Sequence, residues 1–103
     1  MLITWSRHAR EDILGILAYF TSLDEAKTGR SIVSALIQTT ERLSTFPLAG
    51  RQGRIENTRE IIPHKIPYIL VYRIIAPSAV EIARIMHTSR LFPKSLLEDM
   101  EGP

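Results

Sequence analysis

The side chains best suited to chemistry in this sequence are three histidines, and no cysteine is present to act with them. His8, His64 and His87 are too widely spaced for the paired-histidine pattern of zinc sites, and no thiolate can complete one. The sequence also lacks the Gly-x-Ser-x-Gly turn of serine hydrolases and the glycine-rich, lysine-containing loop that cradles nucleotide phosphates. We therefore predict no metal and no cofactor.

A second candidate for chemistry is the segment 50–54, Gly-Arg-Gln-Gly-Arg. Its backbone amides and the guanidinium groups of Arg51 and Arg54 could together bind an anion. The alternative interpretation is a mobile surface loop, since glycine-rich polar segments are typical of exposed connections.

Two further arginines lie in apolar segments that are typical of strands. Arg73 follows the run Tyr-Ile-Leu-Val-Tyr, and Arg84 lies within 80–87. Strict alternation along 80–87 predicts one face with Val80, Ile82, Arg84 and Met86, and another with Glu81, Ala83, Ile85 and His87. A guanidinium in such a strand needs a partner, so each arginine either pairs with a carboxylate or borders a cleft. His87 ends its strand beside Thr88, Ser89 and Arg90, where a polar site can open to solvent.

The formal charge of +2 is unevenly distributed along the chain. Residues 42–94 contain nine basic and three acidic side chains, whereas residues 1–41 carry −1 and residues 95–103 carry −3. Ten of the 13 cations are arginine, whose planar group suits carboxylates and phosphates. This pattern indicates either a cationic half that faces an anionic partner or a scattered, solvated surface.

The hydrophobic pattern predicts one α+β domain, residues 1–103, with an αα-hairpin on a single antiparallel sheet. A strand over 2–5 leads through the N-cap Ser6 into a helix, and a capping box, Ser22-Leu23-Asp24-Glu25, starts a second helix that ends at Phe46-Pro47. Strands over 58–62, 67–75 and 80–87 follow, with a short helix or tail over 94–100. No signal peptide and no apolar run of about 20 residues occurs, so we expect a cytoplasmic protein without a membrane span.

Several of these segments together resemble the RelE/ParE family of bacterial toxins, over residues 1–93. The resemblance rests on Trp5 in the opening strand, Arg-Leu-Ser-Thr-Phe-Pro at 42–47, Gly50-Arg51, Thr-Arg-Glu-Ile at 58–61, the strand 68–74 and the segment 82–90. It implies the plasmid-stabilisation toxin of a type II toxin–antitoxin pair, silenced by a small antitoxin, with the same order of elements.

Members of this family have one of two activities. RelE-type toxins cut mRNA on the ribosome, and ParE-type toxins inhibit DNA gyrase without being nucleases. Cleavage through the RNA 2′-hydroxyl needs a base, cations and an acid. Here the resemblance implies His87, with Glu60 or Glu56 as base and the phosphate held by Arg59, Arg73 and Arg84.

Two groups expected of a nuclease are nevertheless missing, because Thr88 replaces a tyrosine and Ile69 replaces an arginine. The resemblance therefore favours a ParE-type gyrase inhibitor that is not an enzyme. The alternative is a ribosome-dependent mRNA endoribonuclease. A plain nucleic-acid-binding module is a third interpretation, although the basic and aromatic side chains do not interleave as in common RNA-binding sheets.

The expected partners are a cognate antitoxin and DNA gyrase, or the ribosome and mRNA under the nuclease alternative. A toxin–antitoxin hetero-oligomer is among the expected assemblies. An extended or helical antitoxin segment would contact the helical hairpin and the sheet near Arg73 and Arg84. The partner-binding candidates are Arg51, Arg54, Arg59, Arg73, Arg84 and Arg90.

Overall fold

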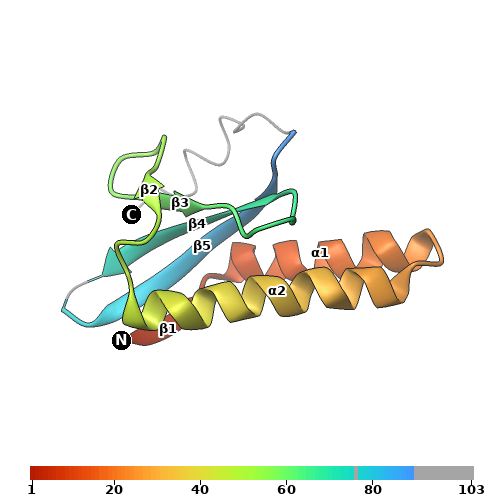
Figure 1. The fold of residues 1–103 in the computed structure, drawn as a ribbon, viewed down its shortest axis with the longest axis horizontal. Coiled ribbons are helices and arrows are strands. Elements are labelled where there is room, and N and C mark those ends of the chain that lie inside the picture. Colours follow the sequence, from red (N-terminus) through yellow and green to blue (C-terminus); the bar gives the residue numbers. More distant parts are fainter. Residues whose placement is uncertain (76, 90–103) are drawn as a thin grey trace.

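The computed structural model describes residues 1–75 and 77–89, which form a five-stranded sheet with two helices on one face (Figure 1). In chain order the elements are β1 (Leu2–Trp5), α1 (Arg7–Ser22), α2 (Ala26–Thr45), β2 (Arg51–Gln52), β3 (Arg59–Ile61), β4 (Tyr68–Ile75) and β5 (Ala79–His87). This confirms the predicted α+β class and the order of a strand, two helices and then strands, but β2 is an additional strand in the segment 50–54, where no strand was predicted. The helix predicted over 94–100 lies outside the described residues.

The sheet has the order β1-β5-β4-β3-β2 and is mixed, not wholly antiparallel as predicted. β1 runs parallel to β5, with Leu2 opposite Ala79 and Trp5 opposite Ile82, and the other pairs are antiparallel. The prediction came from short turns, which make successive strands antiparallel neighbours. No turn joins β1 to β5, so the direction of this pair depends on where the helical hairpin returns the chain.

The predicted start of the first helix is confirmed, whereas the predicted start of the second is wrong. Ser6 is the N-cap of α1, because its hydroxyl oxygen accepts from the Ala9 amide at 3.0 Å. The capping box at 22–25 is wrong, since Ser22 is the last residue of α1 and its hydroxyl donates to the Tyr19 carbonyl. α2 begins at Ala26 without a side-chain cap.

The main core lies between the helices and the sheet. Leu36 and Leu43 of α2 pack there with strand residues, and all the large members are almost fully buried. The strand side of this core comprises Tyr68, Leu70, Tyr72, Val80, Ile82 and Ile85. A smaller cluster of Ile55, Ile69, Val71 and Met86 belongs to the opposite face of the sheet.

A register shift between β4 and β5 changes which face the β5 side chains occupy. Val71 lies opposite Arg84 but Tyr72 lies opposite Ile82, so Ala83 is an extra residue in β5. Beyond it the alternation inverts: Ile85 joins the main core, and Arg84 shares the opposite face with Val71. The predicted division of residues 80–87 into two faces is therefore wrong after Ala83.

Candidate functional site

Glu60 on β3 lies at the centre of the arginine-rich segment. Its side chain is only 1% exposed, and it accepts hydrogen bonds from the Arg54 amide at 2.9 Å and from the guanidinium groups of Arg51 and Arg54 at 3.1 and 3.3 Å. Burial alone would raise the pKa of Glu60, but these hydrogen bonds outweigh it and hold the pKa below its ordinary value. Arg51 and Arg54, two of the predicted partner-binding cations, thus bind a carboxylate of the protein itself.

The chain between α2 and β3 is fastened by a second group of hydrogen bonds. The buried Tyr72 hydroxyl donates to the Pro47 carbonyl at 2.7 Å and accepts from the Gly50 amide at 2.9 Å. Arg59 donates to the Gly50 carbonyl at 2.7 Å. A Cβ on Gly50 would lie 2.7 Å from the Tyr72 oxygen, so this close approach requires glycine. Segment 50–54 is therefore tied to the sheet and does not present a free anion cradle.

Arg73 and Arg84 both pair with carboxylates. Of the two predicted alternatives, a carboxylate partner or a position beside a cleft, this confirms the first. Arg73 binds Glu81 through Nε at 3.1 Å and also through Nη2. Arg84 binds Asp12 of α1 through two contacts at 2.8 and 3.1 Å. Asp12 also accepts from the Ile85 amide, so it joins α1 to β5 beyond the end of β1.

The cations without an internal partner lie elsewhere. Within residues 1–75 and 77–89, five basic side chains have no hydrogen bond or ion pair to the protein, and four of them belong to the helices: Arg10, Lys27, Arg30, Arg42 and Lys65. These cations are therefore on the hairpin and the β3–β4 connection, whereas the charge distribution in the sequence had pointed to the sheet half. Arg90 lies outside the described residues.

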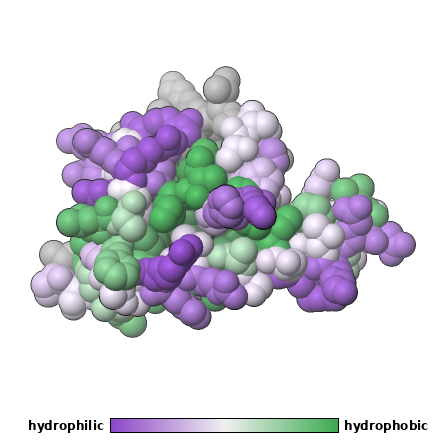
Figure 2. Space-filling model, viewed as in Figure 1, coloured by the Kyte–Doolittle hydropathy of each residue, from purple (hydrophilic) through white to green (hydrophobic). Residues whose placement is uncertain are grey.

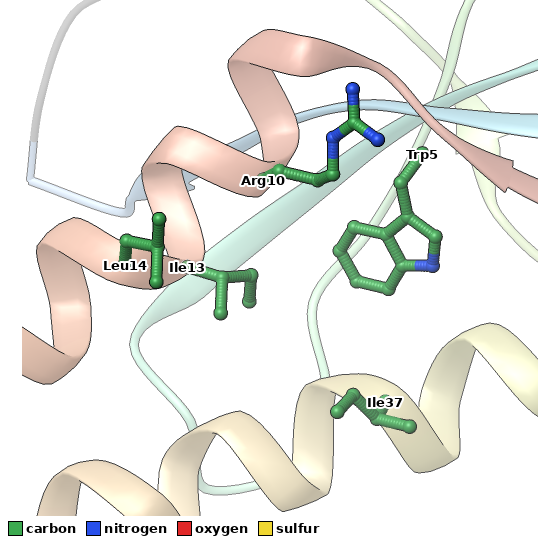
Figure 3. A pocket seen from close by; sticks show the side chains of 5 residues that line it. All are labelled: Trp5, Arg10, Ile13, Leu14 and Ile37. Carbon is green, nitrogen blue, oxygen red and sulfur yellow. The ribbon is translucent and has the colours of Figure 1, made fainter.

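A groove between α1, α2 and the end of β1 carries one of these free cations (Figure 3). Its volume is about 420 Å³, and four apolar side chains line it with Arg10: Trp5, Ile13, Leu14 and Ile37. Leu14 and Ile37 are exposed although they are large and apolar. An apolar groove with one cation suits an amphipathic segment that carries a carboxylate. The only sequence signal for it was the hairpin itself, since Leu14 falls outside the core stripe of its helix.

A second hollow, of about 560 Å³, lies between the end of α2 and the β3–β4 connection, where Arg42, Phe46, Pro63 and His64 are among its lining residues. Phe46 and, two residues further along the chain, Leu48 are 65% and 66% exposed. Hydrophobic side chains gather on this face at the end of the molecule where α2 stops (Figure 2).

The sequence matches the ParE toxin of the type II toxin–antitoxin system parDE over residues 3–92. The chain belongs to the ParE toxin family. It is 34% identical over 94 residues to "Putative toxin Y4kP" of Sinorhizobium fredii, an alignment that covers 91% of this chain and 95% of the relative. A solved structure described as the chromosomal ParDE toxin–antitoxin system from P. aeruginosa superposes with a TM-score of 0.76 at 20% identity, covering 86% of this chain and 97% of that one. The latter similarity shows the shared fold.

In this ParE-family chain the residues implied for RNA cleavage do not meet at one site. His87 lies opposite Tyr68 at one end of the sheet, and its Nδ1 interacts with the Ser89 hydroxyl at 2.7 Å. Glu60 and Arg84 both lie opposite Val71, three residues and about 10 Å further along β4. By register they are on the other face of the sheet from His87. Arg59 and Arg73 lie further still along β4, opposite Tyr72 and Glu81.

In the described part of this ParE-family chain, neither helix has the length and apolarity that crossing a bilayer requires. No group of three potential metal ligands gathers there either.

Proposed function

We propose that this ParE-family toxin acts in the cytoplasm as an inhibitor of DNA gyrase and that a cognate antitoxin neutralises it. The observation that favours gyrase over RNA as the target is that charged side chains needed for RNA cleavage bind one another within the protein. Of the two candidate bases of a nuclease, Glu60 is buried and its carboxylate accepts three hydrogen bonds, whereas Glu56 is exposed. The pKa of Glu60 is held low, which weakens it as a proton acceptor.

Family membership supports the same choice, because the family model that matches is that of the ParE toxin. The phosphate-binding candidates Arg73 and Arg84 are neutralised by Glu81 and Asp12. A protein whose candidate phosphate-binding cations are paired internally can still inhibit a target by binding to it. We therefore infer inhibition by docking, without a catalytic step.

The groove on the helical hairpin is the docking site that we propose for the antitoxin. Trp5, Leu14 and Ile37 provide the apolar surface, and Arg10 provides a cation that has no partner among the described residues. Fully burying a leucine or isoleucine side chain contributes roughly 1.5–3 kcal/mol. Because Leu14 and Ile37 are 65% and 42% exposed, covering both would contribute about 1.5–3 kcal/mol in total, a minor part of a micromolar affinity of roughly 8 kcal/mol. We expect the antitoxin segment to be amphipathic, with a carboxylate that pairs with Arg10.

The test is a supercoiling assay with purified toxin and DNA gyrase. We expect inhibition by the wild-type chain and its reversal when the antitoxin encoded beside the toxin is added. The His87→Ala variant should inhibit equally, since the proposal gives this histidine no chemical role. In cells, DNA replication should stop before protein synthesis. Absence of inhibition at micromolar toxin, together with His87-dependent cleavage of mRNA on ribosomes, would establish the RelE-type alternative instead.

A further inference from the structure

The loop that follows α2 exposes two large apolar side chains, Phe46 and Leu48, and neither lines the hairpin groove. We infer that residues 46–48, with the hollow beside them, are the part of the toxin that enters an apolar, carboxylate-rimmed pocket on its target protein. The inference rests on the proposed function only in taking the target to be a protein.

Exposure is the first argument. Phe46 and Leu48 are among the most exposed large apolar side chains of the described residues, and they flank Pro47 on one short turn. Scattered apolar side chains on a surface are ordinary, but two large ones on a single turn form a compact protrusion. Aromatic side chains are also enriched among the residues that dominate binding energy in interfaces.

The second argument is that this protrusion is held rigidly. The Pro47 carbonyl accepts from the Tyr72 hydroxyl, which is buried in the core and also binds the Gly50 amide. At the other side of the turn the Phe46 amide donates to the Arg42 carbonyl at 2.9 Å, and the Ala49 amide donates to the Phe46 carbonyl at 3.1 Å. Because the backbone is already ordered, docking loses little conformational entropy there.

The third argument is charge, which defines the chemistry of the partner. Arg42 and Lys65 have no internal partner in the described part of the chain, and Arg42 lines the hollow together with His64 and one carboxylate, Glu41. Of the five Arg and Lys side chains in residues 41–65, Arg51 and Arg54 already bind Glu60, which leaves Arg42, Arg59 and Lys65 against Glu41 and Glu56. A target pocket with an apolar floor and carboxylates at its rim would complement this surface in both respects.

The surface also differs from the antitoxin groove in position. The groove and the hollow share no lining residue: Ile37 is the residue of α2 in the groove, whereas Ala35, Thr39 and Arg42 are among those in the hollow. A substitution in one set can therefore change one interaction and leave the other intact.

The experiment compares the double variant Phe46→Ala/Leu48→Ala with the control Leu23→Ala. Leu23 is 49% exposed and precedes α2, about 30 Å from its other end by helix length. Each variant is tested for growth arrest on induction, for gyrase inhibition, and for co-purification with the antitoxin expressed from the toxin's own locus. Circular dichroism and thermal unfolding check that the fold is kept.

We expect the double variant to lose potency roughly 10-fold or more, as for hot-spot truncations, with unchanged antitoxin binding, and the control to match the wild type. Full potency of a folded double variant would overturn the inference, as would a parallel loss of antitoxin binding. If the wild-type chain arrests growth without inhibiting gyrase, the proposed target is wrong, and the growth assay still decides whether residues 46–48 are the target surface.

Discussion

Replacing Glu60 with glutamine tests whether one buried carboxylate holds the arginine-rich segment on the sheet. Glutamine keeps the shape but removes the charge, and its amide group would face two guanidinium donors. The side chain of Glu60 is 1% exposed and accepts three hydrogen bonds, each charge-assisted. Such bonds contribute roughly 1.5–3 kcal/mol apiece. The side chains of Arg51 and Arg54 are 62% and 47% exposed, so water replaces much of what they lose.

We therefore expect Glu60→Gln to lower the free energy of unfolding by about 2–3 kcal/mol, less than the sum of the three bonds. In a domain of about 100 residues this corresponds to a melting temperature lower by roughly 10–20 °C. The matched control is Glu56→Gln in the same segment, because Glu56 is exposed and has no partner among the described residues. The control should change stability by less than about 0.5 kcal/mol.

The pH dependence of the free energy of unfolding tests the contribution of Glu60 independently. The pKa of Glu60 in the folded protein lies below its ordinary value of 4.5. Its contribution to stability is then complete above pH 4.5 and is lost as the pH falls through the folded-state pKa. Urea unfolding of the wild type should show this loss on acidification, and the slope should be smaller in Glu60→Gln. The reasoning would be refuted if the free energy of unfolding of Glu60→Gln lay within about 0.5 kcal/mol of the wild-type value, which is the usual effect of a surface substitution.

Three further substitutions test the remaining contacts. Gly50→Ala should lower the free energy of unfolding by about 1–3 kcal/mol, because the new Cβ would lie 2.7 Å from a buried tyrosine hydroxyl; Gly15→Ala, which meets open space in α1, should be neutral or stabilising by thermal melting. Asp12→Asn should cost about 1–3 kcal/mol by urea titration, since it weakens a partly buried pair with Arg84; an unchanged midpoint would mean that the pair contributes nothing. Ile37→Glu should weaken antitoxin binding about tenfold or more by calorimetry while growth arrest persists, and undiminished affinity would exclude the groove as the antitoxin site.

Much of the architecture follows from local patterns in the sequence. The helical spacing of apolar residues, the Ser6 cap and the Phe46-Pro47 stop predict the start of α1 and the end of α2, because each depends on neighbours within one turn, whereas the predicted start of α2 is wrong. The β-branched and aromatic run at 68–75 likewise predicts β4. The family resemblance also follows from the sequence, since its segments keep their order along the chain.

The tertiary structure alone decided what the charged side chains do. The distribution of charge along the sequence points to a cationic sheet half, but there Glu60 binds Arg51 and Arg54, Glu81 binds Arg73, and Asp12 binds Arg84 from 72 residues away. The apolar groove is on the hairpin instead, as are four of the five cations that have no partner among the described residues. The physical reason is that an ion pair depends on distance in space, and the parallel β1–β5 pair and the extra residue in β5 set those distances through contacts remote in sequence.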